Sequence, residues 1–371
     1  NVAEEPIIKK NFKWMNMFKI RYSFGKVGND VLKIGKDEYR FPYLYTIGDG
    51  TGYTWADYNY SNSYSGKRYT DLASNYATWE IATKHDLGVD LALFNDKFTA
   101  TVDYFHEQRE GIWMERKYLP SIVGLGSNPR ANVGKVLSEG FDGNFAYREK
   151  INKVDITVRG NITYSKNTIL EKDEENNVYP YQMERDYRVN QAKGLIALGY
   201  IKYKDVNGDG VVNDGDKVAI GATTRPNMIY GFGISASWKG LDVNVHFQGA
   251  GKTSFFIDGP TVYAFSSGEW GNILADVAGS NRWIEHEISG TMSTENPNAS
   301  YPRLSYGGNN NNYRQSTYWL RNGSYLRLKT LELGYSIPKP LVNKIRFNNI
   351  RLFLRGSNLL TFSSFKLWDP E

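Results

Sequence analysis

Hydrophobic and polar residues alternate along several segments of the chain with the two-residue period of β-strands. In residues 153–165 the even-numbered positions are mostly apolar and the odd-numbered positions are polar or charged. Residues 87–93, 230–238 and 241–248 repeat this pattern. Because successive side chains of a strand point to opposite faces, each of these segments has one apolar and one polar face. The sequence therefore predicts strands with two unlike faces.

The connections between the predicted strands alternate between very short and very long. Asn95-Asp96 and Lys239-Gly240 are two of the short ones. The hairpins that the short connections join are 79–94 with 97–110, 141–148 with 153–165, and 227–238 with 241–251. The long stretches, rich in Gly, Asn and Tyr, are 28–78, 111–138, 167–226 and 252–316. Short turns on one side and long loops on the other are the plan of an outer-membrane β-barrel.

A large soluble protein built from antiparallel sheets is the alternative, with apolar faces turned to a core. Three features favour the membrane barrel. The predicted strands reach ten residues or more, as a tilted bilayer crossing requires, whereas soluble strands centre on about 5–6 residues. Aromatic residues such as Tyr147, Tyr164 and Trp238 lie at the ends of apolar faces. The alternation of connections also holds along the whole chain. We expect an all-β fold, an antiparallel transmembrane β-barrel with long extracellular loops, in which Ile156 and Val158 face lipid.

The strand pattern also predicts an irregularity and an incomplete barrel. Leu326 and Leu328 share one phase of the alternation, whereas Leu331, Leu333 and Tyr335 share the other. A β-bulge near Lys329-Thr330 would account for this change, because one extra residue shifts the phase of a strand. About nine strands are predicted, although single-chain bacterial barrels have even numbers. We therefore expect an arc of a larger barrel wall, with a descending final strand missing after Glu371.

Composition narrows the class of protein further. Aromatic residues make up 15% of the chain, which suits aromatic girdles at two lipid interfaces. There are no cysteines, which excludes disulfides and thiolate chemistry. The net charge of +5 is small for 371 residues and gives no nucleic-acid footprint. No signal peptide opens the chain, and both ends are expected to be cut points within a longer protein.

One local motif predicts a metal site. Residues 205–216 read Asp-Val-Asn-Gly-Asp-Gly-Val-Val-Asn-Asp-Gly-Asp, which fits a twelve-residue calcium loop with a sharp turn at Gly210. The last position holds Asp instead of the usual bidentate Glu, and the alternative is a metal-free Asp/Asn/Gly turn. We expect a structural Ca²⁺ that rigidifies the loop. Its predicted ligands are Asp205, Asn207, Asp209, the backbone carbonyl of Val211, Asn213 and Asp216.

No pattern of catalytic residues is evident, and we expect no enzyme. The four histidines are far apart in sequence, and no nucleophile elbow is present. Candidates for substrate binding are His246 and Arg159, on polar strand faces, and the loop residues Trp270 and Trp283. His246 is expected to line a pore and not to act as a base. Loop tryptophans can stack on sugars, but packing between loops or contact with a partner lid is the favoured interpretation.

Several short segments follow one another in a fixed order along the whole chain. They are Phe18-Lys-Ile-Arg-Tyr-Ser-Phe-Gly-Lys-Val-Gly-Asn29, Trp79-Glu80 with Asp86-Leu-Gly-Val-Asp90, Asn132-Val-Gly134 with Glu139-Gly-Phe141, Lys204-Asp-Val-Asn-Gly-Asp-Gly210, Gly221 with Pro226 and Tyr230-Gly-Phe232, Asn322-Gly-Ser-Tyr-Leu-Arg-Leu328, Gly356-Ser-Asn-Leu359, and Asp369-Pro-Glu371. Each segment is a weak signal alone, but together and in this order they resemble the SusC/RagA family of TonB-dependent transporters from the Bacteroidetes outer membrane.

The resemblance implies that residues 1–371 are the C-terminal portion of a 22-stranded barrel. The family's plug, TonB box and final strand have no counterpart in this chain. It further implies an integral protein of the Gram-negative outer membrane that imports oligosaccharides or peptides, with a SusD-like lipoprotein lid and the TonB complex, which acts through the absent N-terminal part, as partners. The predicted inward side chains mix both signs of charge, which suits a neutral or zwitterionic solute. The alternatives are a TonB-dependent receptor for another ligand, such as an iron chelate, and a surface barrel scaffold without transport.

Overall fold

A computed structural model describes most of the chain and divides it into two compact units. The described residues are 2–55, 62–116, 128–173, 188–190, 192–195, 200–220, 222–257, 259, 262–266, 272–279, 281–284, 299–344 and 346–370. The first unit comprises Asn1–Arg148 with Thr163–Val178, and the second comprises Glu149–Ile162 with Tyr179–Glu371. None of the helices in the described segments is long and apolar enough to span a membrane.

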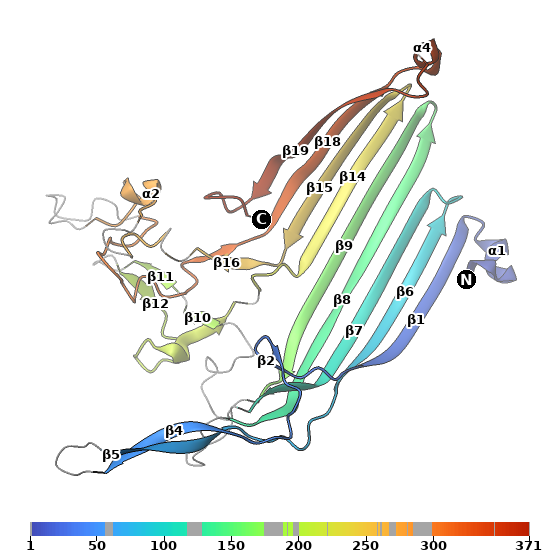
Figure 1. The fold of residues 1–371 in the computed structure, drawn as a ribbon. Coiled ribbons are helices and arrows are strands. Elements are labelled where there is room, and N and C mark those ends of the chain that lie inside the picture. Colours follow the sequence, from blue (N-terminus) through green and yellow to red (C-terminus); the bar gives the residue numbers. More distant parts are fainter. Residues whose placement is uncertain are drawn as a thin grey trace. The chain divides into compact units, whose positions relative to one another are not determined.

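Long antiparallel strands form the first unit. After a 3-10 turn (Val2–Glu4) and the short helix α1 (Pro6–Asn11), the chain enters β1. Figure 1 shows β1, β6, β7 and β8 side by side in the order of the chain. Their bounds are β1 (Met15–Asn29), β6 (Glu80–Leu93), β7 (Phe98–Glu115) and β8 (Arg130–Ile151), and β9 (Val154–Glu171) contributes its residues from Thr163 onward.

The second unit repeats this arrangement with β14 (Met228–Trp238), β15 (Leu241–Gly251), β18 (Tyr325–Ser336) and β19 (Arg351–Ser363). Each strand pairs antiparallel with the next. The turn between β14 and β15 is tight because Lys239 and Gly240 both adopt positive φ angles, 47° and 91°, as two-residue hairpin turns require. The helix α4 (Lys339–Lys344) lies in the connection from β18 to β19.

The strand predictions are confirmed in type and in length. The long strands run from 11 residues in β14 to 22 in β8. The register of β18 shifts against β19 between Leu328 and Thr330, and β15 shifts against β18 at the same height, between His246 and Phe247. The β-bulge predicted at Lys329-Thr330 is therefore present. It lets Leu328 and Leu331 both project from the apolar face of a single strand.

The long connections predicted between the strands contain regular structure that the alternation did not indicate. β7 extends to Glu115, β8 begins at Arg130, and β9 continues to Glu171. Alternation detects only the part of a strand that needs one apolar face, whereas backbone hydrogen bonding continues beyond it. The connections also contain short pairs: β2 (Lys33–Ile34) with β3 (Asp37–Glu38), β4 (Thr46–Trp55) with β5 (Asn62–Asp71), β10 (Arg188–Asn190) with β13 (Lys217–Ala219), β11 (Ala192–Leu195) with β12 (Ile201–Tyr203), and β16 (Ser254–Phe256) with β17 (Leu320–Asn322).

The connecting segments of the second unit share a hydrophobic core of their own. Trp319 is 1% exposed, and its indole Nε1 donates to the carbonyl oxygen of Asn312 at 2.6 Å. The rings of Tyr263 and Tyr313 stack with centroids 4.3 Å apart. The short helix α2 (Ala275–Ala278) adds Val277 to this core. Its other buried members are Ile201, Tyr203, Ile257, Val262, Ala264, Tyr301 and Phe365. These connections form a packed layer with its own buried aromatic residues.

Candidate functional site

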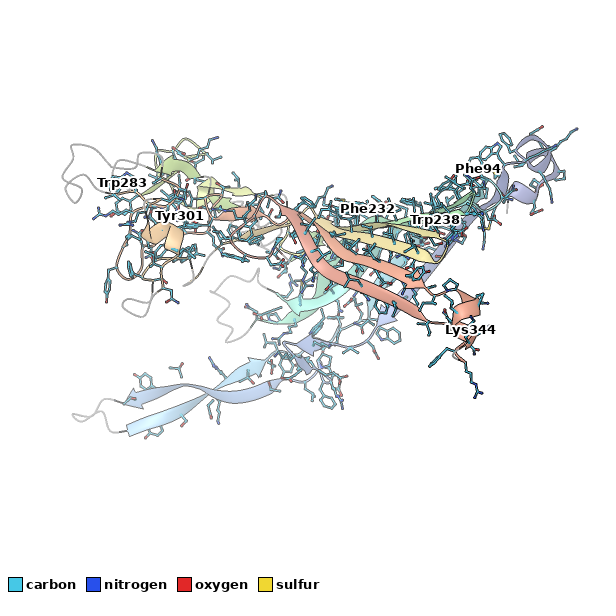
Figure 2. The ribbon with its side chains drawn as sticks, turned by 90° about the horizontal axis from the view of Figure 1, so that it is seen from above. Phe94, Phe232, Trp238, Trp283, Tyr301 and Lys344 are labelled. Carbon is cyan, nitrogen blue, oxygen red and sulfur yellow. The ribbon has the colours of Figure 1, made fainter. Side chains whose placement is uncertain are left out.

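The long strands of each unit carry one face of large exposed apolar side chains, here called the outward face. Ile20 on β1 is 55% exposed, and Leu354 on β19 is 74% exposed. Phe232 and Trp238, labelled in Figure 2, belong to the same face of β14. Burying apolar area is the main driving force for folding, so such a continuous face in a soluble chain would be costly. The face matches the lipid-contacting surface predicted from the alternation.

The opposite, inward face of the first unit carries a charged network centred on Arg21. Its guanidinium lies 2.9 Å from the Asp90 carboxylate and 2.8 Å from that of Asp103. Arg21, Gly88 and Asp103 are direct register partners on β1, β6 and β7. A Cβ at Gly88 would lie 2.6 Å from Cζ of Arg21 and 2.2 Å from the carboxylate of Asp103. The glycine therefore lets an arginine cross the middle strand and reach the third.

A second network lies on the inward face of the same unit, nearer the long loops. Arg109 on β7 donates to Glu80 on β6 and to Glu107, both at 2.8 Å. Lys84 lies 3.0 Å from Glu107. Every carboxylate in this network has a cationic partner. The wall therefore presents many polar groups but no large excess of one sign.

The second unit uses the same arrangement around Arg351. Its guanidinium donates to Asp242 at 3.1 Å through Nε and to Glu332 at 2.6 Å. Gly334 lies on β18 between Arg351 and Asp242, and a Cβ there would come within 2.5 Å of Nη2 of Arg351. A cavity of about 340 Å³ opens beside these groups, and Arg159 and Asn244 also line it.

Two of the predicted substrate-binding residues, His246 and Arg159, lie on this inward face and come close together. Cβ atoms built on Gly231 and Gly233 would lie 3.4 Å from Cε1 and 3.1 Å from Nδ1 of His246. Arg159 Nη2 donates to the side chain of Asn244 at 3.4 Å. Nδ1 of His246 is buried without a hydrogen-bond partner. The strand glycines therefore make room for inward side chains.

One of the two loop tryptophans, Trp283, is buried among the connecting segments. Trp283 is 8% exposed and belongs to the packed loops, and its backbone amide donates to the carbonyl of Tyr301 at 3.0 Å. Figure 2 shows Trp283 and Tyr301 next to each other. Little of the indole ring is left for stacking on a sugar, so packing is the better interpretation. Trp270 lies outside the described residues.

The predicted calcium loop places its oxygen-bearing side chains on one compact turn. The Asp205 carboxylate accepts from the amides of Gly208 and Gly210, at 2.6 and 2.9 Å. Asp209 accepts from the amide of Val211 at 2.8 Å. Gly210 has a φ of 80°, a left-handed conformation that glycine adopts without strain. The sharp turn predicted at this glycine is present.

Asp216 closes the loop and is fully buried. Its carboxylate accepts from the amides of Val206 at 2.7 Å and Asn213 at 2.8 Å, and Asn213 accepts from Gly215 at 2.6 Å. The amides of Asn213 and Val206 lower the pKa of Asp216, because they stabilise its anionic form. Both carboxylate oxygens of Asp216 therefore already have backbone N–H donors within the loop.

The available oxygen ligands also limit how a cation could be bound in this loop. Among the described residues, no three acidic or histidine side chains come together as a metal site. A cation in this loop would therefore need the amide oxygens of Asn207 and Asn213 and the carbonyl of Val211 in addition to its carboxylates. Val211 is 60% exposed and lies at the surface of the turn. Calcium binding remains a prediction.

The inward arginine crossings were not foreseen from the sequence. Arg21 and Asp103 are 82 residues apart, and only the strand register brings them together. A glycine on the polar face of a middle strand, with arginine and aspartate at the paired positions, is the signal that would have revealed them. Finding it requires the register, which alternation alone does not give.

These features define the class of protein: the wall of a membrane β-barrel, with an apolar outward face and a charge-balanced inward face. No protein-family model matches the chain. Along its whole length it is 25% identical to TonB-dependent receptor P26 of Formosa agariphila and 21% identical to TonB-dependent receptor SusC of Bacteroides thetaiotaomicron. The chain spans 38% and 36% of the lengths of these two relatives.

Solved structures give the same result for the fold. The RagAB peptide transporter superposes with a TM-score of 0.70 at 19% sequence identity, over 100% of this chain and 40% of the other. The open-open state of the RagAB peptide importer gives the same TM-score. The resemblance to SusC/RagA-type TonB-dependent transporters is confirmed over the entire chain, and so is the antiparallel barrel fold class.

Proposed function

We propose that this chain forms part of the wall of a TonB-dependent importer in the Gram-negative outer membrane. The importer takes up oligosaccharides or peptides and works with a SusD-like surface lipoprotein and the TonB complex. The observation that carries the proposal is the pairing of unlike faces: large apolar side chains outward and neutralised charges inward. The similarity to SusC and to the RagAB peptide transporter supports it.

The inward networks favour a neutral or zwitterionic cargo. Arg21 is shared by two aspartates, and Arg351 by an aspartate and a glutamate. Fixed charges that are paired create little long-range field, so this wall would not attract one ion type strongly. Arg159 supplies a hydrogen-bond donor close to Asn244 at the cavity. An acidic iron chelate would call for a larger excess of cationic groups.

The proposal is tested by uptake in cells that carry the intact protein. Labelled oligosaccharides, labelled peptides and an iron chelate are supplied separately to wild-type, deletion and TonB-deficient strains. We expect uptake of one solute class, either oligosaccharides or peptides, to be lost in both mutant strains. Loss of iron-chelate uptake alone would establish the alternative receptor. An outer-membrane location with unchanged uptake of every solute would indicate a scaffold.

We also propose that residues 205–216 bind a structural calcium ion. The ligands are the side chains of Asp205, Asn207, Asp209, Asn213 and Asp216 with the carbonyl of Val211. Support comes from the buried Asp216 carboxylate and from the positive φ of Gly210. The ion would hold the turn next to β13, whose first residue is Lys217.

Calcium titration of the intact protein tests this site. We expect Ca²⁺, more than Mg²⁺, to protect the loop from proteolysis and to raise the melting temperature of the protein. Asp216→Asn should abolish that calcium-dependent difference. Asp214→Asn is the matched control, because Asp214 lies in the same loop but contacts Lys217 at 3.1 Å. Equal calcium responses in both variants would refute the site.

A further inference from the structure

A row of ionisable side chains crosses the outward face of the first unit. Phe24, His85, His106 and Glu139 are successive register partners on β1, β6, β7 and β8. The two imidazole rings lie 6.2 Å apart between centroids, and His106 Nδ1 is 3.9 Å from the Glu139 carboxylate. His85 Nδ1 is hydrogen-bonded to the hydroxyl of Tyr22 at 2.8 Å. We call these four groups, Tyr22, His85, His106 and Glu139, the outward row.

The row belongs to the apolar face and not to the inward charged networks. His85 shares its phase with Leu87, and His106 shares its phase with Val102 and Tyr104, because alternate residues of a strand lie on one face. Leu87, Val102 and Tyr104 are each 47% exposed. The ring of Phe24 packs on His85 with centroids 5.0 Å apart. Histidines are thus embedded among side chains that match a lipid-facing surface.

The height of the row places it at the margin of the apolar band. Phe98 follows the short turn, and His106 lies eight positions later on β7 (106 − 98), or about 26 Å along a strand that rises ~3.3 Å per residue. A tilt of about 40° reduces this to roughly 20 Å across the membrane, close to the ~25 Å height of the apolar band in such barrels. The row therefore lies where hydrocarbon gives way to headgroups, on the side of the long loops.

Cationic side chains continue from the row toward the loops. Lys26 on β1 is exposed and two residues beyond Phe24. Lys135 on β8 lies 2.7 Å from Glu110. On β9 the alternation that brings Tyr164 within 5.7 Å of Phe141 places exposed Lys166 on the same face. Lysine stems can lie along apolar surface while their ammonium groups reach polar headgroups.

We propose that the outward row, with Lys26 and Lys166, binds the phosphorylated headgroup of an outer-leaflet lipid. Imidazole, phenol and ammonium groups are donors to phosphate, and charge-assisted bonds of this kind are among the strongest. The acyl chains would run over the apolar face below, which is continuous with the row. Lys135 neutralises Glu110, and the Glu139 carboxylate lies on the His106 side of the row, 3.9 Å from Nδ1 of that residue. The proposal rests on the outer-membrane location proposed above.

Native mass spectrometry of the intact purified transporter tests this site with two lipid probes, phosphorylated and dephosphorylated lipid A. We expect the phosphorylated form to be retained and the dephosphorylated form to be lost on delipidation. The variant His85→Gln with His106→Gln and Lys26→Gln should retain the phosphorylated form about tenfold less, as expected for loss of charged donors. His246→Gln, a histidine on the inward face, is the matched control and should retain it fully.

Several outcomes would overturn the proposal. Equal retention of both lipid forms by the wild type would show that phosphate is not recognised. Equal retention by wild type and triple variant would show that this row is not the site. Displacement of the lipid by millimolar inorganic phosphate would indicate a soluble anion as the ligand. If no lipid of any kind binds and the protein fractionates outside the outer membrane, the proposed location itself fails.

Discussion

The two units have similar inward faces but different outward faces. In the first unit the apolar face ends in histidine, glutamate and lysine. In the second unit no acidic, basic or histidine side chain interrupts the corresponding positions. These positions are Tyr230, Phe232, Ile234, Ala236 and Trp238 on β14 and Leu241, Val243, Val245 and Phe247 on β15. The stacked rings of Phe232 and Phe247, 5.0 Å apart, lie on this face of the second unit.

The inward faces of both units contain the same arrangement of side chains. An arginine crosses a glycine on the middle strand to reach an aspartate two strands away, as Arg21 crosses Gly88 and Arg351 crosses Gly334. On the inward face of both units, arginines are therefore paired with carboxylates and their charges balance. The outward face, by contrast, differs between the two units in whether ionisable side chains interrupt it.

The largest expected effect is from a charge placed in the middle of an outward face. Val158→Arg should destabilise the folded protein by about 2–4 kcal/mol, because a cationic side chain near the bilayer midplane loses its hydration. The free energy of unfolding in lipid vesicles measures this. Thr157→Arg, one residue earlier and on the inward face, is the matched control. A neutral effect of Val158→Arg would reverse the assignment of the faces.

The alternation of apolar and polar residues predicted the features that depend on a strand having one apolar and one polar face. It gave the faces of β14 and β15 and the bulge at Lys329-Thr330, because each of these strands keeps one apolar face along its length. It did not reveal the ends of β7, β8 and β9, which continue into the stretches predicted as connections. It also missed the core around Trp319, whose contacts join loop segments distant in sequence. In the candidate site, the residue types of 205–216 were evident, but the proximity of His246 and Arg159 needed the strand register.

A smaller effect is expected at the two glycine crossings. Gly88→Ala and Gly334→Ala should each cost about 1–3 kcal/mol, because the new Cβ would overlap the arginine and its aspartate partner. Chemical denaturation of the refolded protein measures the change. Gly25→Ala on β1 is the matched control, since a Cβ there meets no atom within 4 Å.

A double variant separates steric overlap from other causes. Adding Arg21→Ala to Gly88→Ala should remove the overlap with the guanidinium, so the two changes should cost less together than the sum of the single costs. Strict additivity would mean that Gly88 does not serve the crossing of Arg21. The same double-mutant cycle at Gly334 and Arg351 would show whether glycine and arginine are energetically coupled in the second unit as well.

The smallest effect is expected at the outward row, and it tests the contrast between the two outward faces directly. His106→Arg should cost only about 0–1 kcal/mol, because a cation at the membrane interface keeps its contact with headgroups and water. Val102→Arg, on the same face of β7 but nearer the bilayer midplane, should cost more. Phe247→Arg in the second unit should also exceed His106→Arg, since its neighbours on that face are apolar. Equal costs for His106→Arg and Val102→Arg, measured by unfolding in vesicles, would place the row inside the hydrocarbon and remove the difference between the two faces.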